Sequence, residues 1–141
     1  MVAVIVAEKP SVAQDLARVL GASGNHPTHI EGNGVLVTWA VGHLLELMEP
    51  ESYDKSFKTW KMDHLPIIPE QFKTKPKAKR NDAAHLKAVV SLINRSDATE
   101  LVNACDAARE GELIFRRIQE HSGSSLPVSR MWMRSMTDSA I

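Results

Sequence analysis

The fold is decided by the stretch Cys105-Asp106-Ala107-Ala108-Arg109-Glu110-Gly111-Glu112. The run before it, residues 100–105, has the composition of a buried strand, and the run after it, residues 113–118, has the period of a helix. In open α/β sheets, ligands bind at the carboxyl ends of the strands. The crowded carboxylates of this stretch would repel one another there, so the sequence predicts a compensating hard divalent cation.

Strand and helix patterns alternate along the rest of the chain. Residues 1–7, 35–40 and 127–133 are expected to form strands, and helices are expected to follow caps at Ser11 and at Asn81 or Asp82. Residues 135–141 have the composition of a helix cap and first turn. The alternation predicts an α/β fold with a mostly parallel sheet and helices on both faces.

Two connecting regions show no such period. Residues 22–34 are rich in Gly and Asn and are interpreted as loop and tight turn, whereas residues 44–48 suggest a short helical turn. Residues 49–79 are expected to be irregular, with one extended piece from Ile67 to Lys75. Residues 73–80 hold four lysines and one arginine, which could contact a phosphate backbone or be a solvated loop.

Composition narrows the class of protein. The chain has 141 residues, the size of one domain, and its 17 basic residues balance 17 acidic ones, so bulk charge does not indicate a nucleic-acid partner. The single cysteine excludes an internal disulfide and a thiolate zinc site, and it fits a reducing, cytoplasmic location. The apolar start, about seven residues, is too short to span a membrane. His26 and His29 have no third ligand nearby, so no zinc site is expected there.

Two interpretations of the acidic stretch stay open from the residues alone. Its carboxylates belong to Asp106, Glu110 and Glu112. They could bind Mg²⁺ together with Glu8, which ends the first predicted strand, if the two strands are neighbours. Alternatively, the two glutamates favour a helix N-terminus through its dipole, and Asp106 caps that helix. Lys9 could place its ammonium against a phosphate, or could be a solvated partner of Glu8.

Four more side chains bear on the same site. Arg109 and Arg130 could point at an anionic ligand or form salt bridges to the acidic stretch. His43 follows a predicted strand end and either lies near the site or is a hydrogen-bonded structural group. Tyr53 is the only tyrosine, and its place in the irregular region makes it a poor candidate nucleophile.

Several separated motifs resemble the Toprim domain of type IA DNA topoisomerases, and the topoisomerase III subfamily above all. They are Ala7-Glu8-Lys9-Pro10-Ser11, residues 35–45, residues 65–69, the pattern from Asp106 to Glu112, and Arg130-Met131-Trp132 with Ser135-Met136-Thr137. The likeness covers essentially the whole chain. It implies a Rossmann-like Toprim fold, with residues 1–141 as a single domain from the N-terminal part of a longer topoisomerase.

For the metal, the resemblance implies a Mg²⁺ site at these carboxylates. Glu8 and Asp106 would be the principal ligands, and Glu110 and Glu112 would assist directly or through water. The family commonly has Asp-x-Asp where this sequence has Ala108 in place of the second acid. The missing carboxylate predicts one Mg²⁺ ion of modest affinity rather than two.

For the DNA, the resemblance implies that Lys9 contacts the scissile phosphate and stabilises its developing charge. Arg130 matches a family arginine near the DNA strand, and His43 matches a family histidine near the site. With Arg109, these residues are the predicted DNA contacts. The predicted catalytic set is Glu8, Lys9 and Arg130.

The family breaks one DNA strand by attack of a tyrosine, passes another strand through and reseals the break without ATP, which relaxes or decatenates DNA. That tyrosine lies in a different domain, so the fragment is expected to be inactive alone.

Expected partners are single-stranded or negatively supercoiled DNA, the remaining domains of the parent enzyme and a helicase. The protein is expected to be a monomer of the cytoplasm, associated with the nucleoid and with no membrane. The alternatives are the Toprim domain of a primase or nuclease, and a non-catalytic module that binds metal or DNA.

Overall fold

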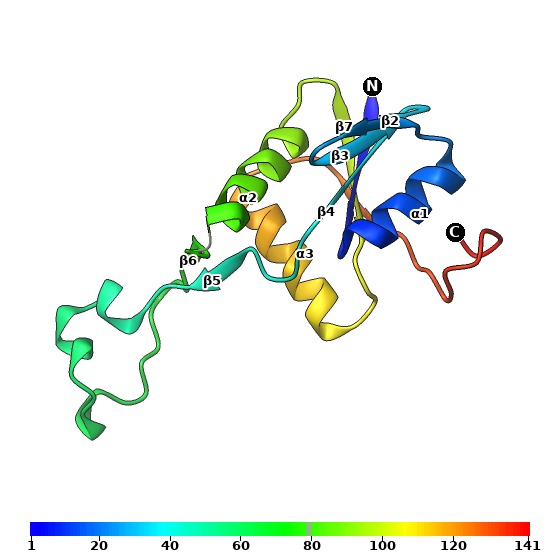
Figure 1. Ribbon diagram of the computed structural model, residues 1–141. Coiled ribbons are helices and arrows are strands. Elements are labelled where there is room, and N and C mark those ends of the chain that lie inside the picture. Colours follow the sequence, from blue (N-terminus) through cyan, green and yellow to red (C-terminus); the bar gives the residue numbers. More distant parts are fainter. Residues whose placement is uncertain (79) are drawn as a thin grey trace.

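The computed structural model describes residues 1–78 and 80–141 and contains a six-stranded sheet (Figure 1). Its parallel strands are β4 (Val35–Trp39), β1 (Val2–Ala7), β7 (Ala98–Ala104) and β8 (Val128–Arg130). An antiparallel hairpin of β2 (Gly24–His26) and β3 (His29–Gly32) extends the sheet, in the order β2-β3-β4-β1-β7-β8. The predicted mostly parallel α/β sheet is confirmed.

Hydrophobic cores lie on both faces of the sheet. Side chains alternate along β1, so Val4 packs in one core while Ile5 packs in the other. α2 (Arg80–Ile93) and α3 (Arg109–Ser122) cover the first core, and α1 (Pro10–Leu20) covers the second. β1 is therefore buried on both faces, as its continuous apolar run predicts. The predicted helices on both faces are confirmed.

The helix starts differ from the predicted caps. α1 begins at Pro10, whose fixed φ suits a first turn, so Ser11 lies inside the helix and does not cap it. α2 begins at Arg80, which puts both Asn81 and Asp82 inside its first turn. Among residues 1–78 and 80–141, no helix has the length and apolar character needed to cross a membrane.

Residues 22–34, expected to be loop, contain the β2–β3 hairpin. Gly24, one of the glycines that indicated a loop, instead permits close strand pairing. A Cβ on Gly24 would lie 2.7 Å from the carbonyl oxygen of Glu31 on the partner strand. Ile30 of β3 packs in the core beneath α1, which fixes the hairpin on the sheet.

An arm formed by residues 45–76 extends away from the sheet (Figure 1). Its base is the antiparallel pair β5 (Leu45–Leu47) and β6 (Thr74–Pro76), so the helical turn expected at residues 44–48 is wrong. Between these strands lie three short 3₁₀ helices, η1 (Pro50–Ser52), η2 (Lys55–Lys58) and η3 (Met62–His64). The arm is irregular, as its proline content predicts.

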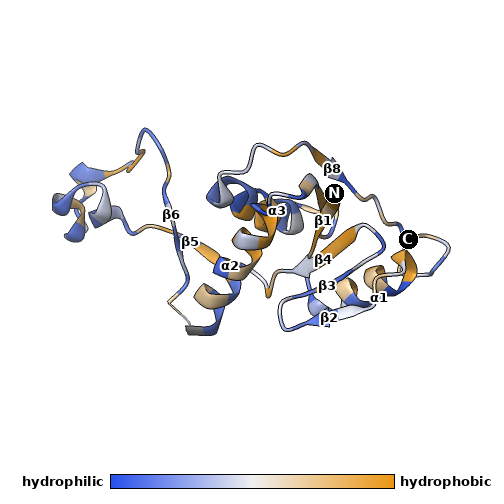
Figure 2. Ribbon diagram, turned by 90° about the horizontal axis from the view of Figure 1, so that it is seen from above, coloured by the Kyte–Doolittle hydropathy of each residue, from blue (hydrophilic) through white to orange (hydrophobic). Residues whose placement is uncertain are grey.

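The arm is mostly hydrophilic, whereas the middle of the sheet is apolar (Figure 2). The arm nevertheless has exposed apolar side chains, among them Trp60, which is 85% exposed. The extended piece expected from Ile67 to Lys75 is found only at its end, where β6 begins. Lys79, part of the basic stretch, lies outside the described residues.

The strand near the C-terminus is shorter than predicted, because β8 covers only part of residues 127–133. Within residues 135–141, the carbonyl of Thr137 accepts hydrogen bonds from the amides of Ala140 at 2.9 Å and Ile141 at 3.3 Å, which agrees with the single turn expected there. Asp138 holds this segment against α1, because its carboxylate accepts two hydrogen bonds from Arg18, each 2.8 Å long.

Candidate active site at the carboxyl edge of the sheet

The carboxyl ends of β1 and β7 lie side by side. The two strands pair in parallel, with Ala7 opposite Ala104. Glu8 follows β1 directly, and Asp106 follows the end of β7 after Cys105. The two acids therefore project from adjacent strand ends, which is the arrangement on which a shared metal site depends.

Glu8 is the most buried of the predicted carboxylates. Its side chain is only 16% exposed, and its one ion-pair partner among the described residues is Lys9, with Nζ 3.9 Å from Oε1. The Lys9 side chain is 65% exposed, so water screens most of its charge. A carboxylate that is largely out of water and weakly paired is a favourable ligand for a cation.

The buried thiol of Cys105 lies in the same concentration of negative charge. Burial is the main cause that raises its pKa to about 12, and the carboxylates of Glu8, Asp106 and Glu112 raise it further against the opposing charge of Arg130. Three acids thus act on one point between the ends of β1 and β7. A cation bound at this edge would reduce their mutual repulsion.

Glu112, in contrast, already has cationic partners. Its carboxylate accepts hydrogen bonds from Arg130, from Nε of Arg116 at 2.7 Å and from Nδ2 of Asn103 at 3.0 Å. The hydrogen bond from Arg130, followed by that from Arg116, holds the pKa of Glu112 below its usual range. The protein itself compensates this carboxylate, which makes it the least available of the four predicted metal ligands.

Arg130 forms the salt bridge that was the alternative to DNA contact. Its Nη2 donates to Glu112, and its Nη1 donates to the carbonyl oxygen of Cys105 at 3.1 Å. A guanidinium has five N–H donors, so donors are left for another acceptor. Arg109 is exposed at the start of α3, and no ion pair of its side chain is found in the described part of the chain.

His43 reaches the site through Glu110. Its Nε2 lies 3.5 Å from Oε1 of Glu110, which is in the first turn of α3. The Glu110 side chain is 75% exposed and that of His43 is 26% exposed. Nδ1 of His43 is buried and, among the described residues, has no hydrogen-bond partner. The structure therefore places His43 beside the acidic stretch, from the opposite side to Arg130.

Gly111 is a site residue to which the sequence interpretation gave no role. A Cβ at this position would lie 2.3 Å from the carbonyl oxygen of Asp106 and 2.7 Å from its nitrogen. Only glycine therefore lets the first turn of α3 pack against the backbone of Asp106. A glycine among the first residues of a helix, where alanine is more favourable, was the available signal.

The interpretation in which Asp106 caps a helix is wrong. The N-cap of α3 is Ala108, and no side chain makes a cap hydrogen bond there. No hydrogen bond or ion pair of the Asp106 carboxylate is found in the described part of the chain, and its residue is exposed. That carboxylate is therefore available to a ligand.

A groove of about 270 Å³ lies beside the acidic stretch. It is lined by Ala107, Ala108, Arg109, Glu112, Arg130 and Trp132. The indole of Trp132 is 66% exposed, next to two guanidiniums. An aromatic face beside positive charge is suited to a nucleotide, because the face stacks on a base while the charge binds phosphate.

The predicted carboxylates share an edge but do not form a closed ligand set. Among the described residues, only one group of three candidate ligands has all its ligand atoms within 4.8 Å of one another, and it consists of His26, His29 and Glu31. The sequence interpretation found no third ligand for these histidines because it missed the hairpin that carries Glu31. That interpretation is corrected by the structure.

Comparison with known proteins gives two findings. The family model of the Toprim domain matches residues 3–134. The chain is 45% identical over 137 residues to DNA topoisomerase 3 of Shouchella clausii (strain KSM-K16), covering 97% of this chain and 18% of that protein. It is 45% identical over 138 residues to DNA topoisomerase 3 of Bacillus subtilis (strain 168), covering 98% of this chain and 19% of that protein. It thus spans less than a fifth of the length of these relatives.

Proposed function

This chain belongs to the Toprim domain family, and on that premise we propose that it is the Mg²⁺- and DNA-binding domain of a type IA DNA topoisomerase. The proposed reaction of the whole enzyme is breakage and rejoining of single DNA strands through a tyrosine, which relaxes or decatenates DNA without ATP. The observation that carries the site is the parallel pairing of β1 with β7, which places Glu8 and Asp106 at one edge. The names of relatives at 45% identity support the choice of enzyme.

For the cofactor, the proposal is one Mg²⁺ ion held by Glu8 and Asp106. These carboxylates have weak cationic compensation, whereas Glu112 is bound by two arginines. Glu110 is exposed and can assist directly or through water. The side chain of Ala108 offers no carboxylate where a second acid would help to hold a second ion. When bound, Mg²⁺ would supply the charge that holds the ends of the broken strand for resealing.

The basic side chains of this edge are the proposed contacts to DNA. Lys9 has an exposed ammonium next to Glu8 and can stabilise charge on the scissile phosphate. Arg130 keeps free donors while Glu112 fixes its guanidinium, so it can position a phosphate at little further entropic cost. Arg109 adds a second guanidinium at the groove, and His43 adds an imidazole on the far side of Glu110.

No nucleophile for strand cleavage is proposed within this chain. Tyr53 is its only tyrosine. The Tyr53 hydroxyl accepts a hydrogen bond from the backbone amide of Lys73 at 2.7 Å, inside the arm. Purified chain is therefore expected to form no covalent adduct with single-stranded DNA, and the remaining domains of the parent enzyme are proposed to supply the tyrosine. A helicase partner, a monomeric state and association with the nucleoid in the cytoplasm stay predictions.

Titration with Mg²⁺ by calorimetry tests the metal assignment. Asp106→Asn is expected to weaken Mg²⁺ binding at least about tenfold, because the amide keeps the size of the side chain but removes its charge. The matched control is Asp63→Asn on the exposed arm, which should leave binding unchanged. Equal affinity of Asp106→Asn and the original chain would refute the site.

Binding of a short single-stranded oligonucleotide tests the DNA groove. Trp132→Ala should weaken binding about fivefold or more, since stacking on one base is worth about 1–3 kcal/mol. Trp60→Ala is the control, because Trp60 is 85% exposed but lies on the arm, away from the groove. An equal loss in both variants, or no loss in either, would remove Trp132 from the proposed DNA path.

A further inference from the structure

A second cluster of metal-binding side chains lies on the β2–β3 hairpin. We propose that His26, His29 and Glu31 form a site for a borderline divalent cation, with Zn²⁺ as the representative ion. Their candidate ligand atoms all lie within 4.8 Å of one another. In the sheet order β2-β3-β4-β1, the hairpin is separated from β1 by β4, so this site is separate from the proposed Mg²⁺ edge.

The hairpin register brings the three side chains to one face. His26 and His29 are direct cross-strand partners, joined only by Pro27 and Thr28. Residues two apart on a strand point the same way, so Glu31 lies on the face of His29. Ile30, between them, packs into the opposite core. The turn thus gathers two imidazoles and one carboxylate on the side of the sheet away from α1.

One ligand–ligand distance is close to that which a tetrahedral ion requires, and the remaining ligand atoms lie within 4.8 Å of one another. Bonds of about 2.0–2.1 Å to a central ion put neighbouring ligand atoms about 3.3 Å apart. Nε2 of His29 is 3.6 Å from Oε2 of Glu31. The His26 ring stacks on that of His29 with centroids 4.3 Å apart, and no hydrogen bond of His26 is found among the described residues. His26 is exposed, so it can turn its ring edge toward an ion held by the other two.

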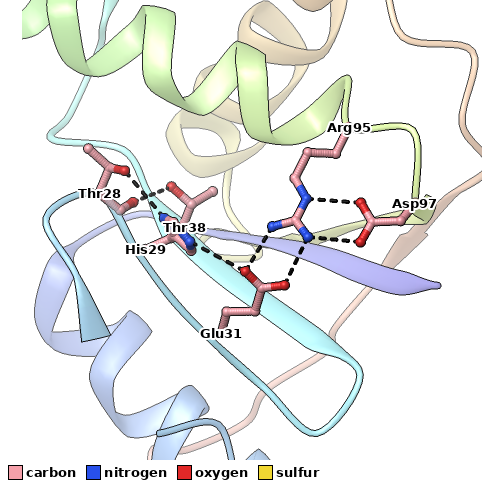
Figure 3. Close-up of polar contacts among 6 residues, drawn as sticks. All are labelled: Thr28, His29, Glu31, Thr38, Arg95 and Asp97. Atoms are coloured by element: carbon pink, nitrogen blue, oxygen red, sulfur yellow. Dashed lines mark hydrogen bonds and ion pairs between the residues drawn. The ribbon is translucent and has the colours of Figure 1, made fainter. Parts of the chain in front are cut away.

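Neighbouring groups hold two of the ligands in the required orientation (Figure 3). The Thr28 hydroxyl lies 3.4 Å from Nδ1 of His29, which leaves Nε2 as the nitrogen facing Glu31. Arg95 donates two hydrogen bonds to the Glu31 carboxylate, at 2.8 and 2.9 Å, but it also binds Asp97. One guanidinium thus serves two carboxylates here, whereas two arginines bind Glu112, so Glu31 keeps negative charge for a cation. Outer partners of this kind usually accompany metal ligands, and each carboxylate oxygen keeps a second lone pair for an ion.

The ligand chemistry selects the class of ion. Two imidazoles with one carboxylate favour Zn²⁺ and similar transition metals, whereas Mg²⁺ prefers oxygen ligands only. Glu31 is 32% exposed and His26 is exposed, so water can fill a fourth position. A bound ion would fasten β2, the outermost strand, to β3 and so stabilise that edge of the sheet.

Calorimetric titration of the chain with Zn²⁺ tests this proposal. One equivalent is expected to bind, and His26→Ala is expected to weaken that binding at least about tenfold. His26 is exposed, so this variant should fold normally. The control is His121→Ala at the exposed end of α3, which should bind Zn²⁺ as the original chain does.

Two further measurements make the result decisive. Zn²⁺ should raise the thermal midpoint of the original chain and of His121→Ala, but not of His26→Ala. In imidazole proton spectra, Zn²⁺ should shift the signals of two of the six histidines, even in excess Mg²⁺. The absence of stoichiometric binding, or equal binding by both variants, would overturn the proposal. Neither result depends on topoisomerase activity.

Discussion

Two regions of the sheet hold a glutamate against an arginine, and they differ in what lies beside the pair. At the carboxyl edge, Arg130 binds Glu112, and the neighbouring ligand atoms are carboxylate oxygens. At the hairpin, Arg95 binds Glu31, and the neighbouring ligand atoms are imidazole nitrogens. The ion pair fixes a carboxylate in both places. In the proposed assignments, the other ligand atoms nearby favour a hard cation at the carboxyl edge and a borderline cation at the hairpin.

The largest expected effect comes from moving the acidic stretch itself. Gly111→Ala would place a Cβ 2.3 Å from the Asp106 carbonyl oxygen, so the first turn of α3 must shift. We expect a loss of about 3 kcal/mol in the free energy of unfolding, measured in urea, and loss of Mg²⁺ binding. Zn²⁺ binding by the folded fraction should survive, because β4 and β1 lie between the hairpin and β7, the strand that leads into α3.

A glycine of the hairpin region is the control for this variant. Gly34 has φ +77°, and a Cβ at this position would meet nothing within 4 Å, so alanine there adds only backbone strain. Gly34→Ala should cost about 1–2 kcal/mol and leave Mg²⁺ binding intact. If both variants lost stability equally and both kept Mg²⁺, the close packing of α3 on Asp106 would not matter to the site.

Measuring a variant of each site with both metals distinguishes the two sites more selectively. Asp106→Asn should weaken Mg²⁺ binding about tenfold, or about 1.4 kcal/mol, and leave Zn²⁺ binding unchanged. His26→Ala should do the opposite. Calorimetry of both variants with both ions gives four values. A variant that lost both ions would mean that the two regions are one site or that the fold is disturbed.

Acid should weaken both ion pairs. The pKa of Glu112 and that of Glu31 lie below the ordinary value of 4.5, each because an arginine hydrogen-bonds to the carboxylate. Such a group stabilises the fold above pH 4.5, and this contribution is lost as the pH falls through the folded-state pKa. With side chains 40% and 32% exposed, we expect about 1 kcal/mol from each pair.

Urea unfolding at pH 7 and pH 3, without metal, measures this effect. The original chain should lose more stability between the two pH values than Glu112→Gln or Glu31→Gln loses. The difference should be similar for the two variants, because both regions use the same kind of pair. A steeper acid loss in either variant than in the original chain would contradict the assigned sign.

The smallest expected effect concerns Arg116. It is the second arginine on Glu112, four residues further along α3, and its side chain is 56% exposed. Arg116→Ala should cost about 0.3–0.5 kcal/mol in urea unfolding, because Arg130 and Asn103 still hold Glu112. A loss above about 1 kcal/mol would show that Arg116, rather than Arg130, is the main partner of that carboxylate.

The sequence predicts the parallel strands well because each has a long, strong signal. β1 is a continuous apolar run, β7 has the buried residues Leu101 and Ala104, and the acids that follow the two strands mark the proposed ligand edge. Their adjacency was only a condition in the sequence interpretation, since strand order depends on contacts between residues about a hundred positions apart. The structure supplies that order.

The hairpin was missed because its strands have three and four residues, too few to show a period. Glycine and asparagine there have the composition of a loop, although Gly24 is needed for close pairing. The role of Gly111 was missed for a related reason, because the atom that excludes a side chain belongs to Asp106 and not to its own helix. Contacts between elements decide both cases.

Cys105 gives the molecule a built-in chemical reporter. The residue is 1% exposed, and burial raises the pKa of its thiol to about 12, so maleimides should react with it only when the core around it opens. Cysteines introduced on the arm could therefore carry fluorophores without background labelling. The rate at which Cys105 itself reacts would then time the opening of the edge that holds the acids.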